Sequence, residues 1–356
     1  MALSILKKLV TGSLAIDLGT MNTIIAVKGR DVVFDEPSLV AVNELTEEIV
    51  AYGQEAFDMR GREGRDIVVK APLSGGVVAD FERTKKMLSY FVKKAKVGSS
   101  RVSLQAVMSM LSDATHVEQR ALLNAAEEAH IGKVYTMEEG LAAAFGADVD
   151  PNEKRASAVV DYGAGTTNIA VVAKGSVVHS RSERIGSNDI NLAIATEMKR
   201  HRGLQIGDET AEILKVTYGS AVLPADPDTS IVVGGRDVQT GSPHAVKVTS
   251  GEIFPVVEGM VKRFAQLVSD TLTELRPEVA ADIHDRGVIL TGGGALLDGL
   301  DTYLRDFINL SVIVPEEPRY ATVRGLLKMF DEPELLEKVS RNELHILQNA
   351  EVPFEA

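Results

Sequence analysis

The chain has 356 residues, which is enough for two domains of ordinary size. Hydrophobic residues make up 45% and charged residues 25%, as in globular proteins, and the formal net charge of −13 argues against nucleic acid as the main partner. The absence of cysteine excludes disulfides, thiolate metal sites and a cysteine nucleophile. No secretory signal and no apolar stretch of about 20 residues is present, so we expect a cytoplasmic protein.

The first ten residues are a candidate amphipathic segment. On a helical wheel, five apolar side chains share one arc and two lysines lie outside it: Leu3, Ile5, Leu6, Leu9 and Val10, with Lys7 and Lys8. One interpretation is an anchor at the inner face of the membrane. The alternative is a segment that packs on the body before the first strand or stays loose, since ten residues form a marginal helix in water.

Strand and helix patterns alternate along the chain, which predicts an α/β fold. In the first half, short apolar runs predict a strand meander at residues 14–18, 24–28, 32–34 and 39–42. Residues 82–96 carry apolar side chains at helical spacing, and the lysines there are interpreted as a solvated face. In the second half we expect strands at 168–172 and 176–179, a β-rich lobe between Pro224 and Pro243, a helix over 252–275 and a strand before Gly292.

Two strands end in the same way, in an aspartate followed by a glycine–threonine turn. The first turn is Asp17-Leu18-Gly19-Thr20 and the second is Asp161-Tyr162-Gly163-Ala164-Gly165-Thr166-Thr167. Taken alone, each is equally well a turn with a helix cap. Because strand, turn and strand repeat in the same order in both halves, we predict a duplicated fold.

An aspartate and glycines at the end of a buried strand suit a magnesium-bound phosphate. Backbone N–H groups bind the anion, and the carboxylate holds the cation, usually through water. Gly292, Gly293 and Gly294 form a third turn, interpreted as a place where backbone approaches a base or ribose; the alternative is a flexible loop. The dinucleotide fingerprint, the P-loop and the zinc and serine hydrolase motifs are all missing from the sequence.

The motifs resemble those of bacterial actins of the MreB family, over nearly the whole chain, and MamK-like bacterial actins are a second match. The resemblance is carried by these segments: Ile16-Asp-Leu-Gly-Thr-Met-Asn-Thr23, Asp35-Glu36-Pro37-Ser38, Gly76-Val-Val-Ala-Asp-Phe81, Ala114-Thr-His-Val-Glu118, Glu138-Glu139, Gly207-Asp-Glu-Thr-Ala-Glu212 and Leu290-Thr-Gly-Gly-Gly-Ala-Leu-Leu297. It implies an actin-like ATPase fold, with duplicated ribonuclease H-like domains around a nucleotide cleft and smaller inserted subdomains.

The resemblance also implies roles for individual residues. Asp17 and Asp161 would hold Mg²⁺, Glu139 would orient the attacking water, and Thr166 would position that water or the terminal phosphate. Without the resemblance, Glu139 is equally an acid favoured by a helix dipole. The implied ATP contacts are Gly19, Thr20, Met21, Asn22, Gly163, Ala164, Gly165, Thr166, Thr167, Glu212, Lys215, Gly292, Gly293 and Gly294.

The sequence departs from the family pattern at several positions. Gly140 stands where proline is usual, Ala164 replaces a glycine and Met21 replaces a small residue. Residues 111–113 replace the usual Pro-x-Gly, and residues 96–102 lack the bulky apolar pair that some relatives insert into lipid. We expect these departures to affect the rate of hydrolysis and the mode of membrane binding more than nucleotide binding.

The implied domain organisation has two halves. The first comprises 11–143 with 317–345, with an inserted subdomain at about 32–74; the second comprises 144–316, with an insertion at about 184–249. Residues 346–356 are expected to form a C-terminal tail.

The resemblance implies a cytoskeletal ATPase that binds Mg-ATP and polymerises head to tail, at the inner face of the membrane, in cell shape or intracellular organisation. Its partners would be copies of itself, the inner membrane surface through residues 1–10, and cell-wall elongation or organelle-positioning proteins. Two alternatives remain: a small-molecule kinase of the same fold, for which we can name no substrate base, and a nucleotide-binding scaffold with little hydrolysis.

Overall fold

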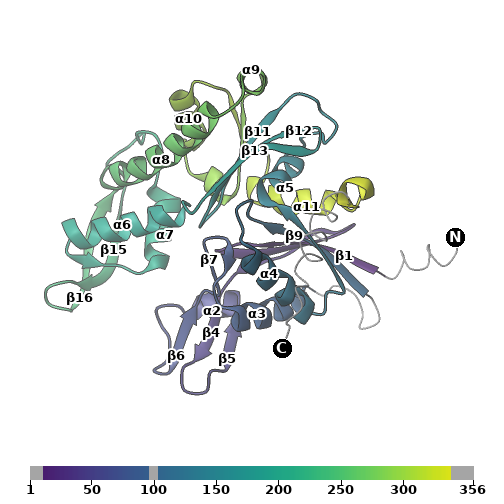
Figure 1. Cartoon of the computed structure of the whole chain (residues 1–356). Helices are drawn as coiled ribbons and strands as arrows, with labels where there is room; N and C mark the ends of the chain where they lie inside the picture. The colour runs from purple at the N-terminus through teal and green to yellow at the C-terminus, as the bar shows by residue number, and fades with distance from the viewer. Residues whose placement is uncertain (1–10, 96–102, 338–356) are drawn as a thin grey trace, which may run out of the picture. The chain divides into compact units, whose positions relative to one another are not determined.

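The computed structural model describes residues 11–95 and 103–337, and the predictions for residues 1–10, 96–102 and 346–356 lie outside this range. The chain divides into two compact units (Figure 1). Unit 1 holds the described residues of Met1–Glu153, Ala173–Val177 and Tyr320–Ala356. Unit 2 holds Lys154–Val172 and Val178–Arg319.

A five-stranded sheet forms the centre of unit 1, in the order β10-β9-β1-β2-β3. Its central strand β1 pairs antiparallel with β2 and parallel with β9. The strands are β1 (Thr11–Leu18), β2 (Asn22–Val27), β3 (Asp31–Pro37), β9 (Ser103–Met110) and β10 (Lys133–Glu138). The first three runs of the predicted meander are therefore confirmed as β1, β2 and β3, although β2 begins two residues earlier than expected. The fourth run, 39–42, was wrongly placed in the same meander, because its strand belongs to a separate three-stranded sheet.

The main sheet of unit 2 repeats this arrangement. Its order is β13-β12-β11-β17-β18, and the central β11 pairs antiparallel with β12 and parallel with β17. The strands are β11 (Ser157–Tyr162), β12 (Thr167–Ala173), β13 (Ser176–Glu183), β17 (Val288–Thr291) and β18 (Val312–Ile313). Read from β18 to β13, this sheet has its strands in the same chain order as the sheet of unit 1 read from β10 to β3. This correspondence confirms the predicted duplication.

Helices cover the sheet of unit 1. Helices α3 (Phe81–Lys94) and α4 (His116–Glu128) contribute Met87, Phe91 and Leu122 to a core shared with β1, β2 and β9. The helix predicted over 82–96 is thus confirmed, starting at Phe81 after the N-cap Asp80. Helix α11 (Ala321–Lys328) contacts β1, β2 and β9 and crosses α5 (Glu139–Gly146).

The α5–α11 crossing depends on two glycines. A Cβ on Gly146 would overlap the carbonyl of Ala321, and a Cβ on Gly325 would overlap the carbonyl of Ala142. The helix backbones therefore meet without intervening side chains, as small residues allow.

The remaining described elements of unit 1 are short. A three-stranded sheet in the order β5-β4-β6 has its own small core, in which Ala56 of a short helix packs. These elements are β4 (Val40–Asn43), β5 (Ile49–Tyr52), β6 (Ile67–Lys70), β7 (Leu73–Ser74), β8 (Val77–Val78), α2 (Gln54–Met59) and the 3-10 helix η2 (Pro318–Tyr320), which ends at the boundary between the units.

In unit 2 a long helix, α8 (Ser250–Thr273), organises the helical part. It begins with a reciprocal capping box between Thr249 and Glu252 and contacts α6, α7 and α10. The other elements are α6 (Asn188–His201), β14 (Leu204–Gln205), α7 (Asp208–Tyr218), β15 (Ser230–Asp237), β16 (Pro243–Thr249), α9 (Pro277–Arg286), η1 (Gly293–Leu296) and α10 (Leu300–Ile308). The β15–β16 hairpin confirms the predicted β-rich lobe, and α8 confirms the predicted long helix.

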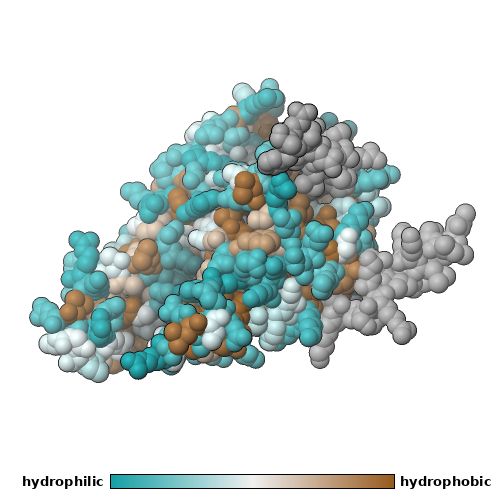
Figure 2. Space-filling view, turned by 60° about the horizontal axis from the view of Figure 1, so that its bottom comes forward, coloured by the Kyte–Doolittle hydropathy of each residue, from teal (hydrophilic) through white to brown (hydrophobic). Residues whose placement is uncertain are grey.

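On the face shown in Figure 2, hydrophilic residues predominate among those described, and hydrophobic residues appear in small groups. Within residues 11–95 and 103–337, none of the helices combines the length and the apolar character needed to cross a bilayer.

Candidate functional site

The first acidic turn joins β1 to β2. Asp17 is the penultimate residue of β1, and it accepts a hydrogen bond of 2.7 Å from the Ser109 hydroxyl on the neighbouring strand β9. Asp17 retains some exposed surface, but burial among protein atoms raises its pKa from 3.8 to about 6. The Ser109 hydrogen bond acts in the opposite direction, and the negative charge of Asp35 raises the pKa further. A nearby cation would therefore stabilise the ionised form of the Asp17 carboxylate.

Hydrogen bonds to the carbonyls of the first turn fix how its backbone is oriented. The Gly19 N–H closes the turn on the Asn22 carbonyl at 3.1 Å, and a Cβ on Gly19 would lie 2.8 Å from that oxygen. Ser38 binds the carbonyl of Gly19 through its hydroxyl and that of Met21 through its N–H. In a trans peptide the C=O and the next N–H point in opposite directions, so the N–H groups of Thr20 and Asn22 face away from Ser38. Met21 has no positive φ, so the turn accepts its side chain without backbone strain.

Sequence reasoning missed Asp35 as a residue of this site. Its two carboxylate oxygens accept hydrogen bonds from Asn22 Nδ2 at 2.6 Å and from the Tyr320 hydroxyl at 3.1 Å. It therefore fixes the end of the glycine turn to the point where the chain re-enters unit 1. The motif Asp35-Glu36-Pro37-Ser38 is visible in the sequence. It does not show that Asp35 lies beside the glycine turn, because that follows only from the pairing of β2 with β3.

The paired glutamates lie where β10 passes directly into α5. Glu138 ends β10 and Glu139 is the first residue of α5. Burial raises the pKa of Glu138. Gly140 is buried in the first turn of α5 and has no positive φ, so its backbone conformation does not require a glycine.

The second acidic turn, in unit 2, has the same register as the first. Asp17 pairs with Ile24 and Asp161 with Asn168, seven residues on in both cases. The Gly163 N–H closes the second turn on the Thr166 carbonyl at 2.9 Å, as the Gly19 N–H does in the first. Asp161, Thr166 and Thr167 are buried.

The beginning of α6 packs directly on this second turn. The N–H groups of Ser187 and Asn188 donate to the carbonyls of Gly163 and Ala164, at 3.0 and 2.9 Å. By the same peptide geometry, the N–H groups of Ala164 and Gly165 face away from α6. Ala164 has no positive φ, so the alanine keeps the turn without strain.

The three glycines after β17 have different roles. Gly292 has φ +84°, and a Cβ there would overlap the Asp161 carboxylate; a Cβ on Gly294 would overlap the Tyr162 ring. Both glycines thus make room for the second turn, whereas a Cβ on Gly293 would meet open space. Tyr162 is buried and stacks on Phe264 of α8, with ring centroids 4.2 Å apart. The expectation that the backbone of Gly292, Gly293 and Gly294 approaches a base or ribose stays a prediction.

Glu212 and Lys215 lie one turn apart on α7 and bind each other. Lys215 is buried, and its Nζ donates to Glu212 Oε2 at 2.8 Å and to the Ser187 carbonyl at 3.4 Å. Asn191 of α6 donates to the same Glu212 oxygen at 2.5 Å. In this arrangement Lys215 orients Glu212 and ties α7 to the start of α6.

In the described part of the chain, no group of three or more acidic or histidine side chains is arranged to hold a metal. Asp17 and Asp161 are the acids at the ends of the two central strands. Their oxygens are suitable ligands for Mg²⁺, which keeps several waters and commonly binds one or two carboxylates together with phosphates.

The duplicated sheets, strand for strand alike, and the matching acid–glycine turns define an actin-like protein of the ATPase fold. A solved structure of MreB5 of Spiroplasma citri bound to ADP matches with a TM-score of 0.86 and 31% identity, over 92% of this chain and 98% of that one. A MamK double helical filament matches in fold, with a TM-score of 0.74 and 23% identity, over 90% of this chain and 99% of that one.

The family model described as MreB/Mbl protein matches residues 11–338, and the chain belongs to this family. Among curated relatives, the cell shape-determining protein MreB of Escherichia coli is 39% identical over 329 residues, covering 90% of this chain and 94% of the relative. The cell shape-determining protein Mbl of Bacillus cereus is 38% identical over 325 residues, covering 91% and 97%. The family resemblance and the fold expected from the sequence are both confirmed.

Proposed function

We propose that this protein is a filament-forming bacterial cytoskeletal ATPase that binds Mg-ATP and polymerises head to tail. The observation that carries the proposal is the pair of acid–glycine turns, which have the same register in the two units. Relatives solved as MreB5 with ADP and with AMPPNP, at 31% identity, support nucleotide as the ligand.

Both turns contribute to phosphate binding in this proposal. In unit 1 the donors are the backbone around Gly19 to Asn22, and in unit 2 the backbone from Gly163 to Thr167. The N–H groups of Ala164 and Gly165 face away from α6, and those of Thr20 and Asn22 face away from Ser38. Backbone donors held in this way bind an anion without reorganising.

Asp17 and Asp161 hold Mg²⁺ through water in the proposed site. The fit rests on the donor set, because the carboxylates of Asp17 and Asp161 at the ends of the central strands are ligands that suit Mg²⁺. The raised pKa of Asp17 agrees with this, since its ionised form gains from a cation. When bound, Mg²⁺ neutralises charge on the phosphates. Ser109 keeps the Asp17 carboxylate oriented.

Glu212 and Gly293 are proposed to contact the nucleoside, with Lys215 and Asn191 orienting Glu212. Gly292 and Gly294 act indirectly in this account, since they give space to Asp161 and Tyr162.

Glu139 is proposed to orient the attacking water, with Thr166 positioning that water or the terminal phosphate. The Glu139→Gln variant should bind ATP with unchanged affinity and release phosphate at least about 100-fold more slowly, because a positioned base contributes about 10²–10⁴-fold. ATP binding is measured with a fluorescent analogue, and phosphate release by a coupled assay.

The matched control is Glu138→Gln, the neighbouring position at the end of β10. Glutamine matches glutamate in size, and the proposal gives Glu138 no contact with the attacking water, so turnover should stay near that of the unchanged protein. Normal turnover in Glu139→Gln would reject the assignment.

We further propose that residues 1–10 bind the inner membrane surface, where many weak anchors on one filament act together. Deleting these residues should reduce co-sedimentation with anionic vesicles and leave ATP binding intact. Equal vesicle binding by the shortened protein would exclude this anchor. The proposed cell-shape role follows the names of the relatives. Contacts with cell-wall elongation or organelle-positioning proteins are proposed from the family resemblance alone.

A further inference from the structure

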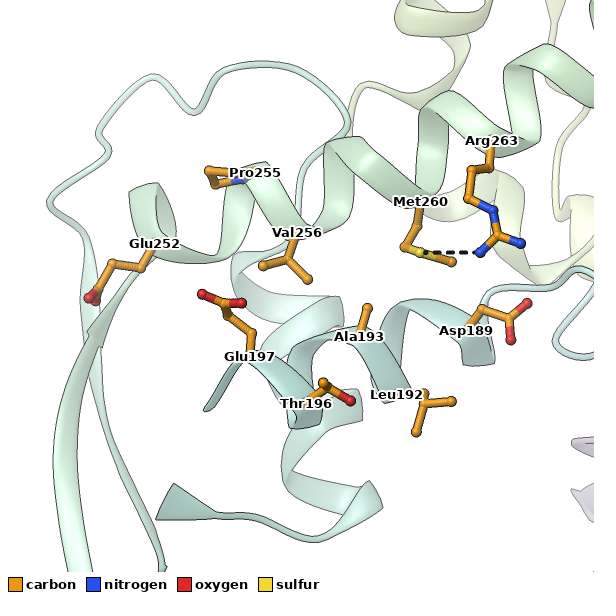
Figure 3. Close-up of a pocket in the computed structure, with 10 residues that line it drawn as sticks. All are labelled: Asp189, Leu192, Ala193, Thr196, Glu197, Glu252, Pro255, Val256, Met260 and Arg263. Carbon is orange, nitrogen blue, oxygen red and sulfur yellow. Dashed lines mark hydrogen bonds between the residues drawn. The ribbon is translucent and has the colours of Figure 1, made fainter. Parts of the chain in front are cut away.

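A groove runs between helices α6 and α8 of unit 2 (Figure 3). It has a volume of about 520 Å³, and a second cavity of about 390 Å³ continues it, since Glu197, Glu252 and Val256 line both. Together the two cavities follow α6 from Asp189 to His201. At a helical rise of about 1.5 Å per residue this length is about 18 Å, which matches about three turns of another helix.

Apolar side chains line the middle of the groove. Figure 3 shows Ala193 of α6 and Val256 and Met260 of α8 extending into the space between the two helices. Leu192, at the same groove, is 68% exposed. The short side chain of Ala193 leaves room for a larger side chain of an occupant, and the flexible Met260 can adapt to its shape. An apolar surface that covered these residues would therefore be stabilised by burial.

The charges at the two ends of the groove differ. An acid and a base, Asp189 and Arg263, lie at one end, whereas Glu197 and Glu252 lie toward the other (Figure 3). Glu252 is already held in an ion pair with an arginine. Glu197 lies 3.7 Å from His201, which is charged only when protonated. In the described part of the chain, Glu197 thus offers a carboxylate at the groove without a permanently charged partner.

We propose that this groove binds an amphipathic helix of a partner protein, with the apolar face of that helix on Ala193, Val256 and Met260 and a lysine or arginine beside Glu197. A helix in a groove is recognised by apolar side chains at positions i, i+3, i+4 and i+7, which lie on one face. The net charge of −13 favours a basic partner over a second copy of this chain, which would carry the same charge. The proposal does not depend on nucleotide binding.

Two synthetic helical peptides test this proposal on the full chain. Both have about 15 residues, or about four turns, with leucines along one face. The lysine peptide carries lysines beside that face, and the glutamate peptide carries glutamates at the same positions. Fluorescence anisotropy of the labelled peptides gives their affinities without nucleotide or lipid. The unchanged protein should bind the lysine peptide at least about ten-fold more tightly than the glutamate peptide, because like charges at an interface are costly.

Variants of the groove separate this binding from general attraction to an acidic protein. Ala193→Lys should weaken binding of the lysine peptide at least about ten-fold, because its side chain fills the centre of the groove. Glu197→Lys should weaken it about two- to five-fold, the range for a partly exposed ion pair, and should tighten binding of the glutamate peptide by a similar factor. The matched control is Asp285→Lys at an exposed position near the end of α9, which should change neither affinity.

The proposal would be overturned by equal binding of the lysine peptide to the unchanged protein and to Ala193→Lys, or by tighter binding of the glutamate peptide to the unchanged protein. Dimers that form without nucleotide and are lost in Ala193→Lys, measured by analytical ultracentrifugation, would also overturn it, because a second copy would then occupy the groove. Thermal melts establish that each variant is folded. Thr196→Lys, at an exposed position that lines the same groove, provides a second variant and should also weaken binding of the lysine peptide.

Discussion

At the scale of single residues, the site is governed by how Asp17 is surrounded. Ser109 and Asp35 act on its pKa in opposite directions, and burial decides the outcome. Asp35 in turn is held by Asn22 and Tyr320, so its charge cannot move away from the turn without breaking two hydrogen bonds. The unliganded protein thus holds an acid whose ionised form is costly until a cation is present.

The raised pKa of Asp17 predicts a pH dependence of stability in the absence of nucleotide and Mg²⁺. Between pH 4 and 6 the folded state keeps a proton that the unfolded state has lost, so the free energy of unfolding should fall as pH rises and level off above about pH 6. Asp17→Asn lacks this titration. Its melting temperature relative to the unchanged protein should therefore increase from pH 4 to pH 7.

The same variant should lose stabilisation by Mg-ATP, because asparagine cannot supply the negative charge. Thermal melts of both proteins, with and without Mg-ATP, give both results. Parallel pH profiles for the two proteins would show that Asp17 does not carry the shifted pKa.

Single residues were partly predictable from the sequence. Asp17 and Asp161 were found because an acid and a glycine interrupt an apolar run, which is a local signal. The roles of Gly292 and Gly294 were not predictable in this way, because what a glycine makes room for is known only once Asp161 and Tyr162 pack against it. The Asp35 contacts likewise join residues far apart in the chain.

At the scale of elements, the α5–α11 crossing links the end of Glu139's helix to the sheet that carries Asp17. The two glycines allow backbone contact between the helices, and α11 packs on β1 and β2. Apolar runs predicted β1 and β2, on which α11 packs, but neither helix of the crossing was predicted. The crossing itself was not predictable, because the periodicity of one helix does not say which helix it meets.

Gly146→Ala and Gly325→Ala should each destabilise the protein by about 3 kcal/mol or more, because the added methyl group meets backbone atoms that cannot rotate away. Chemical denaturation gives the change in the free energy of unfolding. Gly259→Ala is the matched control: it lies inside helix α8, where a Cβ meets no atom within 4 Å, and it should stabilise by about 0.5–1 kcal/mol. Similar effects at all three positions would contradict a close crossing at Gly146 and Gly325.

At the scale of the whole molecule, the main feature is the duplication of the five-stranded sheet and its acid–glycine turn. The two central strands end in acids with the same register, and each turn is closed by the same glycine hydrogen bond. The duplicated fold followed from the family resemblance, and repetition in the sequence pointed to it independently. Polymerisation is not visible in any one residue pattern, because it depends on surfaces that complement each other between copies.

The central claim, that Mg-ATP drives self-assembly, is tested most directly by sedimentation with electron microscopy of the pellet. The unchanged protein should pellet with Mg-ATP, remain in the supernatant without nucleotide, and show filaments by negative stain. Asp161→Asn should bind Mg-ATP weakly and pellet little. Soluble monomers across a wide range of protein and Mg-ATP concentrations, with ATP binding intact, would contradict the account.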